Sequence, residues 1–179
     1  MARQLLPQEV MLTPTTESGL DAGAANGPRL LLGEHHRALE EAGSDLLART
    51  YADEPRALSA EYRVFEREVL DHLAAEELVI LPGYQVASPR DADVIRADHA
   101  AIRQLLFRVG LEIDLHLIRA HTVERLLAQL REHAEHEDTA MYPWAQLHLP
   151  LSTKRRLFVR LGHGIRTLAS LRERARPHS

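Results

Sequence analysis

A histidine–carboxylate motif occurs twice in the chain, at an offset of 61 residues. His72 and Glu76 form the first copy, and His133 and Glu137 form the second. Imidazole and carboxylate groups together are ligands of borderline transition-metal ions. The chain has no cysteine, so thiolate ligands are excluded. The duplicated set therefore predicts a buried site for a pair of metal ions.

The spacing within each copy suits a helix. Residues four apart in a helix lie on one face, with Cβ atoms about 5–6 Å apart. Each copy therefore presents one imidazole and one carboxylate in the same direction. The short motif alone is weak, because a chain with eleven histidines produces such pairs by chance, and His36 with Glu40 forms a third.

Four histidines fall at one depth of the expected bundle. His36 and His99 follow the expected starts of their helices by about 8 and 10 residues. His72 and His133 each precede the proline expected to end their helix by about 10 residues. At about 1.5 Å per residue, all four imidazoles lie about 12–15 Å from the same end. This shared level favours a joint metal site over histidines that are hydrogen-bonded separately in the core.

The elements that would position these residues are helices. Aromatic residues make up only 4% of the chain, and Leu, Ala, Arg and Glu dominate, which is a helical composition. Short loops favour an all-α, up-down-up-down antiparallel four-helix bundle made of two hairpins. Capping residues, prolines and glycines predict three helices over residues 28–50, 55–81 and 89–110. A fourth helix is predicted to begin between residues 114 and 122 and to end at residue 143, and a fifth to cover residues 152–174 with an interruption at 162–164.

The chain is expected to have three parts. Residues 1–28 form a flexible N-terminal arm, residues 29–149 the four-helix bundle, and residues 150–179 a basic, amphipathic C-terminal helix packed on the bundle. Residues 154–176 carry a net charge of +7, which leaves −11 on the rest of a chain whose net charge is −4. A homodimer contact and docking to an acidic partner are alternatives for this helix in an otherwise monomeric protein.

Several functional classes are excluded by what the sequence lacks. No apolar run is long enough to span a bilayer, and no signal-peptide pattern is present. No nucleic-acid motif, phosphate-binding loop or nucleophile elbow occurs. The absence of cysteine suits a reducing compartment. We therefore expect a cytoplasmic protein with neither a membrane nor a nucleic acid as its partner.

The donor set indicates which metal would bind. Four imidazoles and two carboxylates favour a transition metal over calcium or magnesium, which prefer oxygen ligands. If both carboxylates bridge, each ion receives two imidazoles and two carboxylate oxygens, and about one position stays open. Two iron ions (Fe²⁺/Fe³⁺, with an oxo or hydroxo bridge) suit such a site, with manganese or zinc as substitutes.

This pattern, a lone histidine followed by His-x-x-x-Glu and a proline-terminated helix, all of it repeated, resembles the hemerythrin-like, HHE cation-binding family over roughly residues 29–145. The resemblance implies a four-helix bundle with a non-haem di-iron centre. Roles known in the family are oxygen binding, oxygen or iron sensing, handling of peroxide or nitric oxide, and oxidation chemistry. The ligands that the resemblance implies are His36, His72, Glu76, His99, His133 and Glu137.

The chain departs from the oxygen-carrying members at one ligand position. Those proteins have a second histidine four residues after the one in the third helix, and here that position is Arg103. They also end with His-x-x-x-x-Asp, which Asp138 fits. A five-residue step turns about 140° around a straight helix, so Glu137 is the preferred ligand. The resemblance is therefore closer to members that sense or oxidise.

Neighbouring residues leave alternatives open. Aligning the leucines around His36 with the isoleucines around His99 favours His36 over His35 as the ligand. Glu40 is a third carboxylate or a surface charge, and Arg103 pairs with a site carboxylate, gates the open positions or faces solvent. The candidates for additional or outer-shell roles are His35, Glu40, Glu77, Asp138, Arg103, Tyr62 and His116.

Three functions follow from these expectations. The first is a di-iron protein that binds or activates O₂, peroxide or nitric oxide in a stress response or in sensing. The second is a di-iron oxygenase, oxidase or peroxidase that acts on an organic substrate. The third is a regulatory protein in which metal occupancy sets the stability of the bundle and the basic helix binds a partner.

Overall fold

The structure, a computed structural model, describes residues 27–52 and 55–175, and within them every element is helical. Of the arm expected over residues 1–28, residues 1–26 lie outside the described part, and Gly27 already belongs to the first helix. The helices are α2 (Gly27–Ala52), α3 (Pro55–Val79), α4 (Leu81–Ala87), α5 (Pro89–Asp114), α6 (Ala120–Thr139), α7 (Met141–His148) and α8 (Leu151–Ala175).

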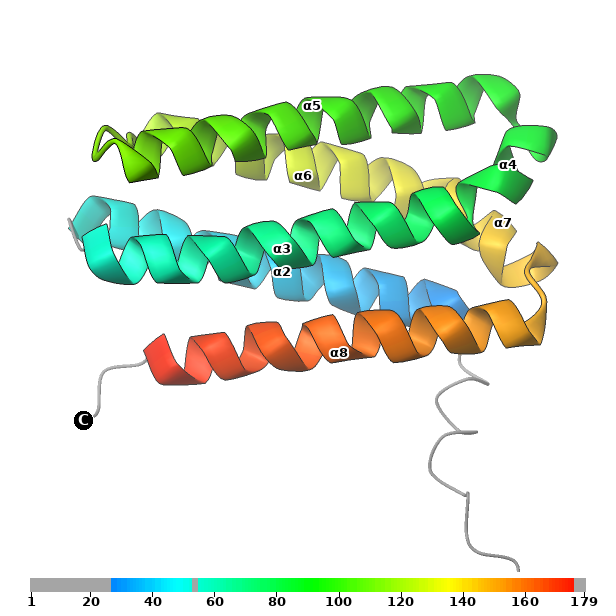
Figure 1. The fold of residues 1–179 in the computed structure, drawn as a ribbon. Coiled ribbons are helices and arrows are strands. Elements are labelled where there is room, and N and C mark those ends of the chain that lie inside the picture. The colour runs from blue at the N-terminus through cyan, green and yellow to red at the C-terminus, as the bar shows by residue number, and fades with distance from the viewer. Residues whose placement is uncertain (1–26, 53–54, 176–179) are drawn as a thin grey trace, which may run out of the picture.

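Four long helices, α2, α3, α5 and α6, run alternately up and down and form the bundle (Figure 1). The short helices α4 and α7 lie at one end, where α3 and α6 finish and where α2 and α5 begin. The additional helix α8 packs along α2 and α3. The predicted all-helical bundle with an extra C-terminal helix is confirmed.

The hairpin helices end earlier than the sequence predicted, because their prolines belong to the next element. α3 ends at Val79, and Pro82 lies in the first turn of α4. α6 ends at Thr139, and Pro143 lies in the first turn of α7. Proline is tolerated there because a backbone N–H in the first turn has no partner within the helix.

Two glycines predicted to end or interrupt helices lie inside continuous ones. α5 runs past Gly110 to Asp114, and α8 is unbroken at Gly164. A Cβ atom at position 110 would lie 3.0 Å from the ring of Tyr62. A Cβ at position 164 would lie 2.6 Å from Nε2 of His35 and 2.7 Å from Oε2 of Glu68. These glycines therefore mark close packing rather than helix ends.

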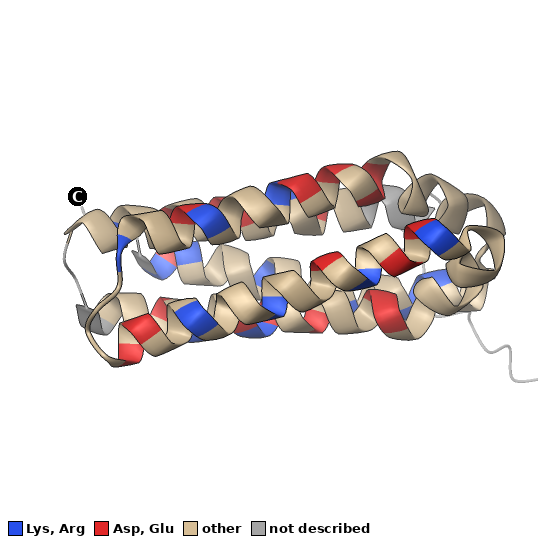
Figure 2. Cartoon of the chain, turned by 90° about the horizontal axis from the view of Figure 1, so that it is seen from above, with Lys and Arg blue, Asp and Glu red and all other residues tan. Residues whose placement is uncertain are grey.

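The basic residues of α8 contact acidic residues of the bundle. Arg172 forms ion pairs with Asp45, at 2.7 Å, and with Glu41, both on α2. Arg160 contacts Asp71 of α3 at 3.4 Å. Elsewhere, acidic and basic residues are interspersed along the helices (Figure 2). The positive charge concentrated in the last helix thus faces part of the negative charge on the bundle.

The apolar core consists of two clusters that follow one another along the long axis of the bundle. The larger includes Leu46, Phe65 and Leu106, and the smaller, nearer α4 and α7, includes Ile95 and Met141. Among the helices of the described ranges, none combines the length and apolar character that a membrane crossing requires.

Candidate metal centre

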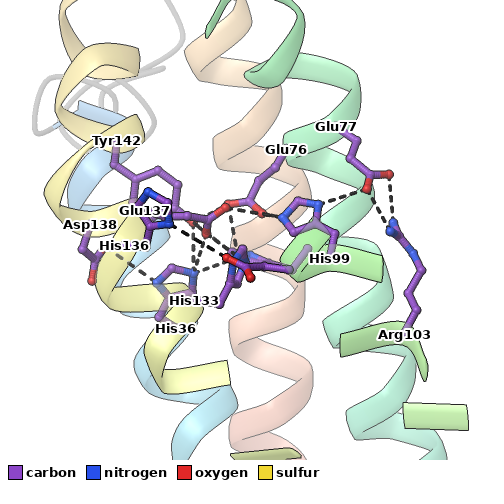
Figure 3. Close-up of polar contacts among 12 residues, drawn as sticks. His36, Glu76, Glu77, His99, Arg103, His133, His136, Glu137, Asp138 and Tyr142 are labelled. Carbon is purple, nitrogen blue, oxygen red and sulfur yellow. Dashed lines mark hydrogen bonds and ion pairs between the residues drawn. The ribbon is translucent and has the colours of Figure 1, made fainter. Parts of the chain in front are cut away.

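A layer of buried polar side chains separates the two apolar clusters. It contains one position on α2, two on α3, one on α5 and two on α6 (Figure 3). Five of its members are at most 2% exposed, and the side chain of His36 is 10% exposed. Buried polar groups are costly unless they find partners. The layer consists of His36, His72, Glu76, His99, His133 and Glu137.

One group of donor atoms forms between α2, α3 and α6. Nε2 of His36 lies 2.9 Å from Nε2 of His72 and 3.4 Å from Oε2 of Glu137. Nε2 of His72 lies 3.3 Å from Oε1 of Glu76. The ligand atoms of these four residues lie within 4.8 Å of one another, so they can surround a single ion.

A second group forms between α3, α5 and α6. Nε2 of His99 lies 3.5 Å from Oε2 of Glu76 and 3.5 Å from Oε1 of Glu137. Nε2 of His133 lies 3.2 Å from Oε2 of Glu137. Both glutamates belong to both groups. The two carboxylates therefore lie where they would bridge a pair of ions.

The spacing of these donor atoms fits metal coordination. Ligand atoms about 2.1 Å from a cation are about 3.0 Å apart at right angles and about 3.4 Å apart in a tetrahedral arrangement. The measured separations of neighbouring donors run from 2.9 to 3.5 Å. Oε2 of Glu76 and both ring nitrogens of His133 are buried without a hydrogen-bond partner among the described residues. The residues therefore fit a pair of cations.

The electrostatics of the layer also suit positive charge. Burial alone would lower the pKa of His36, but the facing carboxylates of Asp138 and Glu137 raise it to about 9. Burial alone would also lower the pKa of His99, but the carboxylates of Glu137 and Glu76 raise it to about 10. Burial raises the pKa of Glu76, yet the neighbouring His72 and His99 hold it well below its ordinary value. The buried carboxylates therefore stabilise positively charged groups beside them.

The model of the hemerythrin HHE cation-binding domain matches residues 28–145. The chain belongs to this family. Comparisons with curated proteins and with solved structures gave no match. The matched residues span the four long helices and the His/Glu layer, so the family assignment and the geometry both indicate that this hemerythrin domain binds metal cations.

Carboxylates outside the layer contact two of its histidines. Nδ1 of His99 lies 3.0 Å from Oε1 of Glu77. Both oxygens of Glu77 accept hydrogen bonds of 2.8 Å from Arg103, on the outer side of the site (Figure 3). Nδ1 of His36 faces Oδ1 of Asp138 at 3.7 Å. Glu77 and Asp138 each follow a shared glutamate, so the outer contacts repeat with the motif.

Glu77 couples an arginine to the site of this hemerythrin domain. Burial raises the pKa of the Glu77 carboxyl, but Arg103 and His99 together lower it below its ordinary value. Such partners fix the tautomer and the orientation of a ligand imidazole. Arg103 therefore contacts the site through Glu77.

The other candidates do not join the layer. His35 is buried, stacks on the ring of His72 with a centroid distance of 4.8 Å, and faces Gly164 of α8. Glu40 is exposed and pairs with Arg131 at 2.7 Å. Tyr62, a candidate for an outer-shell role, donates its hydroxyl to the backbone carbonyl of Leu106 in the core.

His116, the last of the candidates for an outer-shell role, lies in the loop between α5 and α6. It is exposed and has a φ of 57°, a conformation that suits a turn. This loop is at the end of the bundle opposite α4 and α7 (Figure 1). The structure therefore does not bring His116 to the His/Glu layer.

Sequence reasoning missed Tyr142, which α7 inserts into the layer (Figure 3). Its hydroxyl lies 3.0 Å from Nε2 of His36 and 3.3 Å from Nε2 of His72. The repeat contained a signal, because the matching position 61 residues earlier is Leu81, which has no polar atom. A hydroxyl that is present in only one copy of a duplicated motif indicates a candidate site residue, and this difference could have identified Tyr142.

A cavity of about 380 Å³ leads from the surface to the layer of this hemerythrin domain. It lies between α2 and α6, and His36, His72 and His133 line its inner part. Its lining also includes the exposed pair of Glu40 and Arg131. The apolar part of its wall comprises Leu39, Leu73, Leu127 and Leu130.

Proposed function

We propose that this chain is a cytoplasmic, hemerythrin-like di-iron protein that binds or activates O₂, peroxide or nitric oxide, in a stress response or in sensing. The observation that carries the proposal is the pair of buried donor groups that share Glu76 and Glu137. Mixed imidazole and carboxylate ligation suits iron, with manganese or zinc as substitutes. A bound iron pair would supply the electrons and open positions that such ligands require.

The residues of the layer have separate tasks in this proposal. His36 and His72 would hold one ion, and His99 and His133 would hold the other. The two glutamates, which belong to both donor groups, would hold both ions and offset their charge. The apolar clusters on either side limit contact with water and strengthen electrostatic interactions in the layer.

Access to the layer supports a small ligand. The cavity between α2 and α6 reaches three of the four layer histidines, and four leucines line part of it. A small, weakly polar molecule such as O₂ or nitric oxide is compatible with that wall, because it loses little hydration on entry. The pair of Glu40 and Arg131 stands at the exposed side of this path.

The proposal is tested by exposing the anaerobically iron-loaded protein to O₂, nitric oxide and peroxide in turn. We expect near-ultraviolet and visible absorption changes with at least one of the three. His99→Ala, which removes a donor of the second group, should abolish or strongly reduce them. Glu132→Gln, at an exposed position of α6 outside the cavity lining, should retain them. An iron-loaded protein whose spectrum none of the three ligands changes would reject the proposed function.

A second candidate is a di-iron enzyme that oxidises a small organic substrate. The size of the cavity favours it, because about 380 Å³ falls within the range of about 300–1,000 Å³ typical of pockets for organic ligands. Substrate-dependent oxygen consumption by the iron-loaded protein would support it. Leu130→Trp, which narrows the cavity, should then slow the reaction without lowering the iron content. Oxygen consumption that no reductant or apolar substrate increases counts against this candidate.

A further inference from the structure

The hydroxyl of Tyr142 occupies a position among the donor atoms of the first group. The residue is fully buried. Its oxygen lies 3.0 Å from Nε2 of His36, 3.3 Å from Nε2 of His72 and 3.0 Å from Oε2 of Glu137. It also contacts Oε1 of Glu76. The phenol oxygen therefore lies beside all four members of this group at once.

These separations match those between ligands of a single ion. Ligand atoms about 2.1 Å from a cation and at right angles to one another are about 3.0 Å apart. The Tyr142 oxygen keeps nearly this spacing from His36, His72 and Glu137. A hydroxyl has only one proton to donate. One hydrogen bond to a carboxylate does not account for a position shared with two imidazoles and a second carboxylate.

We propose that Tyr142 is a metal ligand, whose phenolate oxygen binds the ion held by His36 and His72. The inference rests on the proposed function, because it requires that the layer binds metal. The first ion then has two imidazole nitrogens and three oxygens from the protein, including one from each shared glutamate. Ligands of this kind suit ferric iron, for which an anionic oxygen is a strong donor.

Charge explains why the cation is needed for this bond. In the protein alone, the hydroxyl of Tyr142 lies against the carboxylates of Glu137 and Glu76. The phenol is then neutral and donates its proton to a carboxylate. A bound cation is the largest local charge in such a site and favours the phenolate, so the phenolic proton is released to solvent as the metal binds. Tyr142 therefore acts as a ligand only when the layer is loaded.

The duplicated halves differ at this position, and the two ions are therefore inequivalent. The residue that corresponds to Tyr142 in the first half is Leu81, which has no donor atom. The ion held by His99 and His133 has four protein donors and keeps more open positions. A small ligand should bind there, and His133 lies on the wall of the cavity.

The visible spectrum of the iron-loaded protein tests the inference. After anaerobic loading of the full chain with Fe²⁺ and oxidation in air, the wild type should show a phenolate-to-Fe(III) charge-transfer band in the visible region. Resonance Raman scattering excited within this band should show the ring vibrations of a coordinated tyrosine. In Tyr142→Phe the visible band should vanish, while iron stays bound through the remaining four donors of the first group.

Tyr84→Phe is the matched control. Tyr84 is also a buried tyrosine at the α4–α7 end, but its hydroxyl bonds Asp91 and not the layer. This variant should keep the band. An iron-loaded wild type without the band or the phenolate vibrations would overturn the inference and leave the proposed function standing, as would a band that persists in Tyr142→Phe. A wild type that binds no iron would overturn both.

Discussion

Glu76 and Glu137 are each followed by a second carboxylate, and the two neighbours have different tasks. The first carboxylate lies at the centre of the layer, between the histidines of two hairpins. The second reaches outward to a histidine of the opposite hairpin, at 3.0 Å for Glu77 and 3.7 Å for Asp138. One residue is about 100° of helix rotation, which separates the inward side chain from the outward one. The motif thus specifies both the donor residues and the outer carboxylates that contact the donor histidines.

Replacing Glu77 tests whether these outer carboxylates matter. Glu77→Ala leaves Nδ1 of His99 and the guanidinium of Arg103 without their shared carboxylate. Loss of such a partner typically weakens metal affinity about 10- to 100-fold. Competitive titration of Fe²⁺ against a chelator under anaerobic conditions measures the change. Glu132→Ala, an exposed glutamate of α6, is the control and should bind iron as the wild type does. Equal affinities in both variants would contradict the assigned role.

The sequence predicted the residues that the helical repeat specifies. His36, His72, His99 and His133 could be placed at one level because helix rise and short loops leave little freedom. The choice of His36 over His35 followed from the apolar stripe, and only His36 reaches the layer. Tyr142 was not predicted because its position depends on a change of direction between α6 and α7. No periodicity extends across that junction.

At the scale of the elements, glycines decide how closely helices approach. Gly164 lets α8 lie against His35 and Glu68, and His35 in turn stacks on His72. Both side chains beneath α8 are buried and have little room to move. The sequence predicted a break in α8 because glycine is a poor helix former. Tertiary packing overrides that propensity here, and it is not visible in a local pattern.

A pair of glycine substitutions separates packing from propensity. Gly164→Ala should lower the free energy of unfolding by about 1–3 kcal/mol, because the new methyl group overpacks the contact with α3 and α2. Gly162→Ala should raise it by up to about 1 kcal/mol, because its Cβ meets only Arg166, at 3.7 Å. Urea unfolding of both variants measures the two effects. A stabilising Gly164→Ala would show that α8 does not pack as described.

Asp91 connects three elements at the α4–α7 end. It lies in the first turn of α5, accepts a hydrogen bond from Tyr84 of α4 and contacts Nε2 of His136 of α6 at 2.7 Å. Burial alone would raise the pKa of Asp91, but Tyr84 and His136 lower it below its ordinary value. The carboxylate therefore stabilises the fold at pH values above its unfolded-state pKa.

Asp91→Asn should lower stability at neutral pH by about 0.5–1.5 kcal/mol. The difference should disappear as the pH falls through the lowered pKa of the folded state, where the wild-type carboxyl is protonated too. Thermal unfolding between about pH 2 and pH 7, a range that extends well below the ordinary aspartate pKa of about 3.9, measures this dependence. Asp93→Asn is the control, because its 3.5 Å contact with Arg96 is exposed and worth little. A penalty that stays constant with pH would exclude the ionised carboxylate as its cause.

At the scale of the whole molecule, the bundle holds a polar layer between two apolar clusters. The clusters supply the burial that stabilises the fold, and the layer interrupts them with six polar or charged side chains. The element order and the antiparallel arrangement could be predicted from hydrophobic patterning and loop length. The position of α8 in the groove of α2 and α3 could not, because it depends on contacts such as Arg172 with Asp45, which are distant in sequence.

Metal binding should therefore stabilise the whole domain. An ion that binds only the folded state adds about 2.7 kcal/mol when its free concentration is 100 times its Kd. Melting curves with and without Fe²⁺ or Zn²⁺ should show a higher Tm in the loaded protein. The double variant His72→Ala with His133→Ala should show no such increase. An identical Tm for the wild type with and without added metal ions would indicate that the layer is structural and does not bind ions.

We propose that the layer encloses a pair of metal ions, and the iron content per chain after anaerobic loading and removal of loosely bound metal tests this proposal. We expect two irons per wild-type chain, one for each donor group. The double variant His72→Ala with His133→Ala should lose the bound iron while circular dichroism shows a retained helical fold. A folded wild type without bound iron, or a double variant that holds as much iron as the wild type, would contradict it.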